Sequence, residues 1–409
     1  MTMNTSRKEF LSLAAALAAG GSLDAAPSAG GVKPPRFKPF EIPNLEPRPD
    51  FWKSRPDEIV ALCEKAKKCS RKEIICHTPL GYPVYALFYG DFNDAPPQTN
   101  WSAGKASTTY RNYYGRPQGG KQTFYFLAGV HGAEPETVVG AMNLIQMLET
   151  GRDFRGESDP ELLDLISKYR FIVTPCVNMD GRSISPDHLR GVDWVTFRHA
   201  SQGTWAADGS RIGWRGSKAW FPLPLDKVSY PGGYPNADGY NIMHDACPGD
   251  LRTAEAKALL NVAARWRVDA VLNGHSYEHA PTVLLPTGID YPEKAMRGLA
   301  IRHRCNMALH ERGLLLKRPV PPAQGELPKG AGININNLLS LASGCIALTL
   351  ECSVSFAGPW KHPKSTKDPE KKYTFEELIA PVGVVLKEYL KDGLERPFVN
   401  RGPETVFKD

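Results

Sequence analysis

Four ionisable residues follow or end hydrophobic segments of the chain, and their types are those of a hydrolytic metal site. Two histidines and one glutamate commonly hold a catalytic zinc ion, which keeps a fourth position for water. A further carboxylate that does not bind the metal can then take the proton of that water. We therefore predict one zinc ion (Zn2+) per chain with the metal ligands His131, Glu134 and His275, and Glu351 as the general base.

Each of these residues has an ordinary explanation when it is taken alone. The pattern His-x-x-Glu occurs at His131 and again from His275 to Glu278, so the pair by itself is weak evidence for a metal. A single histidine is more often exposed or fully hydrogen-bonded, and a glutamate at a strand end often faces water. The prediction depends on all four residues together, each placed at the end of a hydrophobic segment.

Hydrophobic segments alternate with amphipathic ones from residue 57 onward. This alternation predicts an α/β fold with a mostly parallel, mixed central sheet, helices on both faces and long loop insertions at 91–121 and 182–237. In such sheets, ligands bind at the carboxyl ends of the strands. The expected strands are 73–76, 82–89, 124–130, 169–177, 268–273 and 345–351. The expected helices are 57–69, a helix from Pro135 onward, 251–266, 291–312 and 375–390.

The chain divides into four segments. Residues 1–31 combine a charged start, a short apolar middle and small residues, and they resemble a twin-arginine export signal whose pair is Arg7-Lys8. Residues 32–56 form a proline-rich lead-in, 57–395 the catalytic domain and 396–409 a C-terminal tail. The expected location is periplasmic or extracellular, and the alternative is a cytoplasmic protein with a disordered N-terminal tail.

The composition is that of a globular protein of 409 residues, since 42% of them are hydrophobic, which excludes a chain that is disordered throughout. The net charge of +6 is small, and the one dense basic run, 361–372, also holds prolines and acids, so we expect no nucleic-acid partner. The apolar part near the N-terminus is too short for a membrane span. The eight cysteines permit disulfides without requiring them.

Five short motifs resemble those of the zinc carboxypeptidase family, the carboxypeptidase A-like metallopeptidases. They are His131-Gly132-Ala133-Glu134-Pro135-Glu136, Asn178-Met179-Asp180-Gly181 with methionine in place of the family's proline, Trp214-Arg215, His275-Ser276-Tyr277 and Leu350-Glu351. The resemblance covers most of residues 55–390 and implies a divergent member of that family. It implies a metallopeptidase in which zinc and Glu351 activate water and Arg215 stabilises the developing oxyanion.

The segment that binds a free C-terminal carboxylate in the family departs from the family pattern here. Its arginine corresponds to His244. A histidine is largely neutral above a pKa of roughly 6.5, so it should bind a carboxylate weakly and release it as the pH rises. The residues expected to bind substrate are His244, Asn241 and Tyr277. The alternative sources of the missing charge are Arg182, Arg198 and Arg211 in the long insertion.

The expected function is hydrolysis of an amide bond in a peptide or peptide-like substrate, of the metallocarboxypeptidase type. The alternatives are a zinc amidase or deacylase that acts on a non-peptide or cell-wall amide, and a non-catalytic binding protein that retains the fold. A further alternative places His275 and His279 one turn apart on a helix, as a His-x-x-Glu-His zinc motif. Gly274 before it and Pro281 after it leave little room for such a helix.

Overall fold

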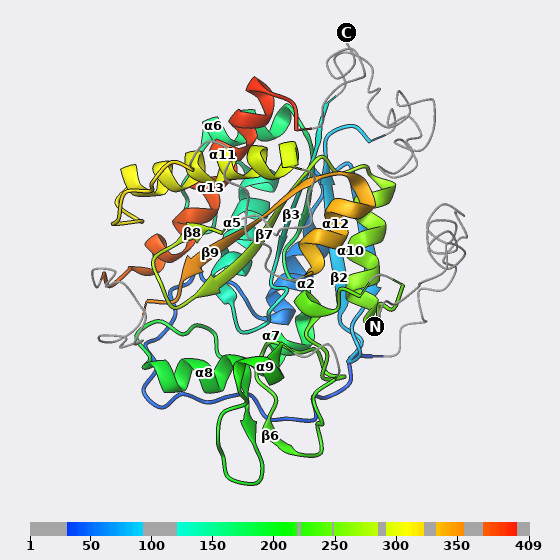
Figure 1. Ribbon diagram of the computed structural model, residues 1–409, viewed down its shortest axis with the longest axis vertical. Coiled ribbons are helices and arrows are strands. Elements are labelled where there is room, and N and C mark those ends of the chain that lie inside the picture. The colour runs from blue at the N-terminus through cyan, green and yellow to red at the C-terminus, as the bar shows by residue number, and fades with distance from the viewer. Residues whose placement is uncertain are drawn as a thin grey trace.

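A seven-stranded sheet lies at the centre of the part of the chain that the structure describes (Figure 1). The structure is a computed structural model, and it describes residues 31–92, 121–218, 222–247, 249–284, 292–322, 333–355 and 371–398. The strands are β1 (Arg71–His77), β2 (Pro83–Tyr89), β3 (Thr123–Ala128), β4 (Arg170–Thr174), β7 (Ala270–Tyr277), β8 (Thr282–Val283) and β9 (Ile346–Ser353). Their order across the sheet is β1-β2-β4-β3-β7-β9-β8.

The central strands of this sheet are parallel. β4 pairs with β3, β3 with β7 and β7 with β9, all in parallel, whereas β1, β2 and β8 join by antiparallel pairing. The predicted α/β fold with a mixed sheet is confirmed. Because the four parallel strands end at the same edge, residues that follow or end β3, β7 and β9 are brought close together.

Helices cover both faces of the sheet. Successive side chains of a strand point to opposite faces, so apolar residues in succession give each face a hydrophobic cluster that helices must cover. In β3, Phe124 and Phe126 belong to one hydrophobic cluster, and Tyr125 and Leu127 belong to another. The first cluster lies under α2 (Pro56–Lys65), α5 (Pro135–Thr150), α6 (Pro160–Ser167), α11 (Pro292–Glu311) and α13 (Phe375–Glu395). The second lies under α10 (Ala254–Arg265) and α12 (Ile335–Ser343), on the other side of the sheet in Figure 1.

The long insertion between β4 and β7 lies at one end of the sheet (Figure 1). It contains α7 (Met179–Ile184), α8 (Trp194–Gln202), β5 (Thr204–Trp205), α9 (Trp214–Ser217), β6 (Val228–Tyr230) and a 3-10 turn, η1 (Ile242–His244). The prediction of an irregular segment at 182–237 was wrong where α8 forms. Asp193 caps this helix, since its Oδ1 accepts hydrogen bonds from the N–H groups of Val195 and Thr196 at 2.8 and 3.0 Å.

Two further helices, α6 and α12, were not predicted. Asp159 caps α6 by accepting from the N–H of Leu162 at 3.0 Å, and Pro160 occupies the first helical position. Asn334 caps α12 in the same way through the N–H of Asn336 at 3.0 Å. These start signals were present in the sequence, but the helices are short, with 8 and 9 residues.

The proline-rich lead-in contains no helix or strand among its described residues before Pro56, where α2 begins, and its end packs into the domain. Trp52 is fully buried, its Nε1 donates to the carbonyl oxygen of Asp187 at 2.8 Å, and its ring centroid lies 5.0 Å from that of Phe375. Beyond α13, the buried ring of Phe398 lies 5.3 Å from Tyr389. The packed unit therefore extends past the limits 57–395 at both ends.

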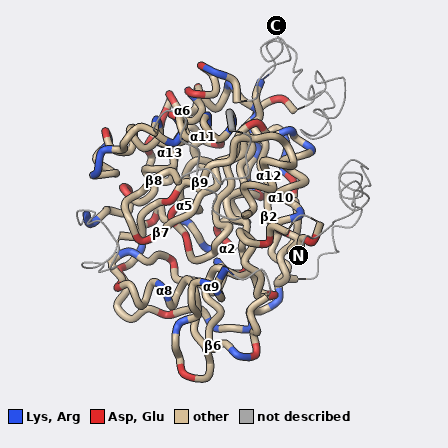
Figure 2. Tube along the Cα trace, in the orientation of Figure 1, with Lys and Arg blue, Asp and Glu red and all other residues tan. Residues whose placement is uncertain are grey.

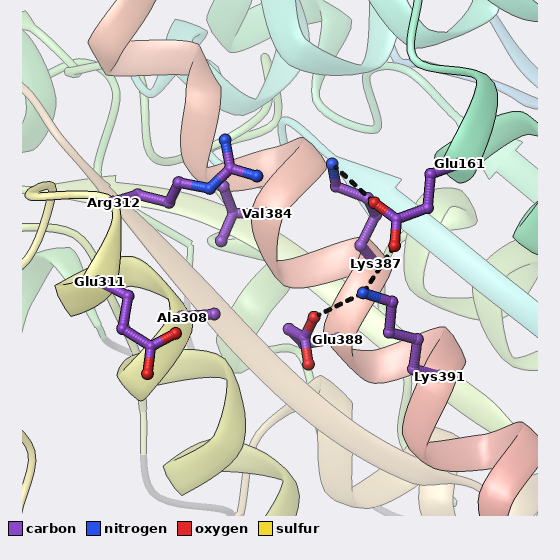
Figure 3. Close-up of a pocket in the computed structure, with 8 residues that line it drawn as sticks. All are labelled: Glu161, Ala308, Glu311, Arg312, Val384, Lys387, Glu388 and Lys391. Carbon is purple, nitrogen blue, oxygen red and sulfur yellow. Dashed lines mark hydrogen bonds and ion pairs between the residues drawn. The ribbon is translucent and has the colours of Figure 1, made fainter.

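A hollow lined by charged residues lies where α6, α11 and α13 meet (Figure 3). Lys391 Nζ lies 2.7 Å from a carboxylate oxygen of Glu161 and 3.1 Å from one of Glu388. Lys387 Nζ lies 3.5 Å from Glu161. Such solvent-facing pairs contribute about 0–1 kcal/mol each, so the buried apolar side chains of these helices hold them together.

Charged residues of both signs are spread along the described chain, with no long run of one sign in the trace (Figure 2). All eight cysteines lie in the described residues, and each is a free thiol there. Within the described ranges, no helix has the length and apolarity that a membrane span requires. Residues 1–30 of the predicted export signal, the body of the loop at 91–121 and most of the basic run at 361–372 lie outside the described residues.

Substitution Trp52→Ala tests whether the lead-in is part of the folded unit. We expect a loss of about 3–5 kcal/mol in the free energy of unfolding, because a fully buried tryptophan and its hydrogen bond are removed. Val32→Ala is the control in the same segment, since Val32 is 48% exposed, and it should change stability by less than about 0.5 kcal/mol. Equal denaturant midpoints for the two variants would show that the lead-in does not support the fold.

Candidate metal centre and active site

The loop after β3 is fixed by close packing against the turn after β4. A Cβ atom on Gly132 would lie 2.1 Å from the backbone nitrogen of Arg182, so only glycine fits there. The buried guanidinium of Arg182 donates through Nη1 to the carbonyl oxygen of Gly132 at 2.8 Å. Asn178 begins the turn by accepting from the N–H of Gly181 at 2.8 Å. This packing holds His131 and Glu134 at the end of β3.

Three buried side chains converge on one point at this edge of the sheet. Nδ1 of His131 lies 3.0 Å from Oε1 of Glu134, and Nδ1 of His275 lies 2.7 Å from Oε2 of the same carboxylate. The candidate ligand atoms of the three residues all lie within 4.8 Å of one another. This set of two imidazole nitrogens and one carboxylate oxygen has the composition of a catalytic zinc site.

Asn241 determines which nitrogen of His131 can bind a metal. Its Nδ2 donates to the carbonyl oxygen of Ser217 at 2.7 Å, and its Oδ1 lies 3.1 Å from Nε2 of His131. An oxygen can only accept, so Nε2 must carry the hydrogen and Nδ1 keeps its lone pair. The ring of His131 also stacks on Tyr234, with centroids 4.2 Å apart. The histidine is thus held in the tautomer that a metal requires.

His275 is positioned by the sheet. It lies within β7, directly opposite Glu351 of β9 in the parallel register, and the N–H of Ser276 donates to Glu134 Oε2 at 3.2 Å. Nε2 of His275 is buried and has no hydrogen-bond partner among the described residues. Because His275 lies in a strand, the alternative that places His275 and His279 one turn apart on a helix is wrong.

The electrostatics of the cluster suit a cation. Burial raises the pKa of Glu134, but the charges and hydrogen bonds of His131 and His275 outweigh it and lower the pKa to about 2. Burial lowers the pKa of His275, which favours its neutral, ligating form. An ionised carboxylate between two imidazoles, all buried, is the arrangement that a divalent metal stabilises.

Glu351 lies on the strand next to His275 and does not belong to the three converging residues. Its Oε2 is buried and has no hydrogen-bond partner among the described residues. Burial, and after it the charges of Glu134 and Glu278, raises the pKa of Glu351 well above its usual range. The positive charges of Lys218 and Arg198 lower the pKa of Glu351, but by less. Glu351 therefore offers an unpaired carboxyl group at the edge of the cluster.

The structure places the other predicted site residues in different surroundings. Asn241 makes its side-chain contacts with His131, Ser217 and Met243, and the hydroxyl of Tyr277 donates to the carbonyl oxygen of Ala280 at 2.9 Å. The side chain of Arg215 on α9 is exposed and makes no hydrogen bond or ion pair with the described residues.

His244 is largely removed from solvent beside the cluster. Burial, and after it the charges of His131, Lys218 and His275, lowers the pKa of His244 to about 3. The pKa of this histidine thus lies well below the value of roughly 6.5 that an ordinary histidine has. His244 is neutral across the physiological range, so it offers no positive charge to a carboxylate.

Two residues beside the cluster, Tyr234 and Lys218, were not predicted. Tyr234 stacks on His131, and Trp214 lies edge-on to Tyr234 at 6.3 Å between ring centroids. Lys218 follows α9, with its Nζ 4.0 Å from the ring centroid of Trp214. No sequence signal marks Tyr234 or Lys218, because their proximity to His131 arises from the path of the long insertion.

The fold and the buried His, Glu and His cluster are together of the kind found in metal-dependent hydrolases of the α/β class. A model of the zinc carboxypeptidase family matches residues 63–293, which is more than half of the chain, and the protein therefore belongs to this family, whose members are zinc metallopeptidases. No curated protein sequence matches the chain.

Several solved carboxypeptidase structures are similar to the chain at low sequence identity. A metallo-carboxypeptidase from Burkholderia cenocepacia is 14% identical over 82% of this chain and 68% of that one, with a TM-score of 0.48. A metallo-carboxypeptidase from Pseudomonas aeruginosa, in complex with (2-guanidinoethylmercapto)succinic acid, is 15% identical over 83% and 68%, with a TM-score of 0.45. Carboxypeptidase A from Helicoverpa armigera is 15% identical over 97% and 82%, with a TM-score of 0.46.

Substitution of Asn241 tests whether its hydrogen bond prepares His131 for metal. Asn241→Leu removes the acceptor for Nε2, and we expect zinc affinity to fall by roughly 10- to 100-fold, as measured by competition with a chelator. Asn241→Asp keeps an acceptor and should retain most of the affinity. His244→Asn is a control beside the cluster and should leave affinity unchanged. Wild-type affinity in Asn241→Leu would contradict the assignment.

Proposed function

We propose that the protein hydrolyses an amide bond in a peptide or peptide-like substrate, with one zinc ion held by His131, Glu134 and His275. The observation that carries this proposal is the convergence of two Nδ1 atoms on the Glu134 carboxylate, with Glu351 on the neighbouring strand. Membership of the zinc carboxypeptidase family supports a metallopeptidase. When bound at these residues, zinc supplies a Lewis acid that polarises the scissile carbonyl and makes water more acidic.

Glu351 is the proposed general base. It lies beside His275 without belonging to the converging cluster, so it is free to accept a proton from the attacking water and to pass it to the leaving amine. Its buried Oε2 has no hydrogen-bond partner among the described residues, and a cation held at the cluster would favour the ionised form of Glu351 that accepts the proton. Arg215 is proposed to meet the negative charge on the carbonyl oxygen in the transition state. Its side chain is exposed and unpaired among the described residues, which leaves it available to a substrate.

The segment around His244 supports a departure from simple recognition of a C-terminal carboxylate. A neutral histidine cannot form the charge-assisted, bidentate contact that an arginine makes with a carboxylate. We therefore assign Asn241 to the support of the metal ligand His131, and His244 to the wall of the site. Export to the periplasm or the cell exterior by way of residues 1–31, and the division into lead-in, catalytic domain and tail, also remain proposals.

Substitution Glu351→Gln tests the proposed function most directly. It keeps the size of the side chain and removes the proton acceptor, so we expect the zinc content to stay at about one ion per chain while kcat falls by ~10²-fold or more. Cleavage of a mixed peptide library would be followed by mass spectrometry of the new termini. Glu278→Gln provides a matched control, since Glu278 also faces Arg198 but has no proposed role in proton transfer. Near-normal turnover in Glu351→Gln would place the base elsewhere.

A further inference from the structure

A chain of ring contacts leads from the metal cluster to a cationic side chain. His131 stacks on Tyr234 at 4.2 Å, Tyr234 meets Trp214 at 6.3 Å, and Lys218 Nζ lies 4.0 Å from the Trp214 ring centroid. Trp214 is 47% exposed, so this end of the chain opens to solvent. The lysine ammonium is therefore placed beside the metal cluster, on a side that a substrate can reach.

The backbone at Lys218 is fixed to the same cluster by a second route. The carbonyl oxygen of Ser217 accepts the hydrogen bond from Asn241 Nδ2 at 2.7 Å, and Asn241 in turn holds Nε2 of His131. The last residue of α9 is thus joined to a candidate metal ligand through one side chain. This connection places Lys218 at a defined position relative to the metal cluster.

The three arginines considered as replacements for the missing charge are held by other groups. The guanidinium of Arg182 is buried and donates to backbone carbonyl groups, among them that of Gly132. Arg198 forms a buried ion pair with Glu278. The guanidinium of Arg211 lies over the ring of Trp194, 4.6 Å from its centroid. Burial, and then the charge of Arg198, lowers the pKa of Arg211. None of the three arginines considered as replacements for the missing charge is free at the cluster.

Lys218 differs from these residues in having no partner for its charge. Its side chain is half-buried, and among the described residues its Nζ makes no hydrogen bond and no ion pair. Burial lowers the pKa of Lys218, and the charges of Glu351 and Glu134 act against this effect. A partly desolvated ammonium without a partner is unfavourable, and an anion bound beside it removes that cost.

We propose that Lys218 binds a carboxylate of the substrate next to the scissile amide, so that the enzyme selects anionic substrates through this residue. The inference rests on the proposed hydrolytic function. The carboxylate is either the free C-terminus or an acidic side chain, since both present the same group to an ammonium. Trp214, over whose ring the lysine ammonium lies, provides the apolar wall of this subsite.

Two matched pairs of peptides separate these sources of the carboxylate. In the first pair the C-terminus is an amide, and the residue after the scissile bond is Glu or Gln. In the second pair, the residue after the scissile bond has a neutral side chain, and the C-terminus is a free acid or an amide. A charge-assisted contact predicts a preference of roughly 10- to 100-fold in kcat/KM for the carboxylate in one of the pairs.

The variants at Lys218 identify the residue responsible. Lys218→Met keeps the apolar stem against Trp214 and removes the charge, so the preference should fall to about one, mainly through KM. Lys218→Arg should restore most of it. Lys227→Met removes an exposed lysine of the same insertion and should leave the preference intact. Arg215→Met should lower kcat alike for both members of a pair.

Binding measurements distinguish failure of this inference from failure of the proposed hydrolysis. The same peptides are titrated by calorimetry into zinc-loaded Glu351→Gln protein, with and without Lys218→Met. A carboxylate preference that depends on Lys218, without turnover by the wild-type enzyme, would uphold the binding site and overturn the hydrolytic function. No preference in either pair, a preference that survives Lys218→Met, or an equal loss of kcat for every peptide would overturn the inference.

Discussion

The buried carboxylate of Glu134, held between the Nδ1 atoms of His131 and His275, is the interaction on which the rest of the site depends. Its oxygens lie 3.0 and 2.7 Å from the two ring nitrogens, and its interactions with the two histidines hold the pKa of Glu134 below its usual range. Such a group is costly to bury unless a cation compensates it. The negative charge of Glu134 also raises the pKa of the nearby Glu351 and that of Lys218.

The fold brings these groups together through the parallel order of β3, β7 and β9. His131 and Glu134 follow β3, whereas His275 and Glu351 lie opposite each other within β7 and β9. Hydrogen bonds between strands therefore fix two of the four residues. The other two depend on loop packing, and Gly132 is essential there because no side chain fits against Arg182. The long insertion then adds Asn241 and the aromatic contacts around Trp214.

Much of the sheet and the converging residues could be predicted from the sequence, because buried strands are continuous hydrophobic segments and ligand types are few. His131, Glu134 and His275 do meet in the structure as expected. The helix α8 could not be recognised in a segment rich in tryptophan and glycine. The low pKa of His244 and the place of Lys218 depend on burial by residues distant in sequence, which local patterns do not contain.

Anomalous diffraction at the zinc absorption edge, from crystals of the protein purified with its metal, tests the central claim most directly. The account predicts one strong peak per chain, about 2.0–2.2 Å from Nδ1 of His131, Nδ1 of His275 and a carboxylate oxygen of Glu134. The same measurement on His131→Ala should show a weak peak or none. A full peak at any other group of side chains, or an undiminished peak in that variant, would contradict it.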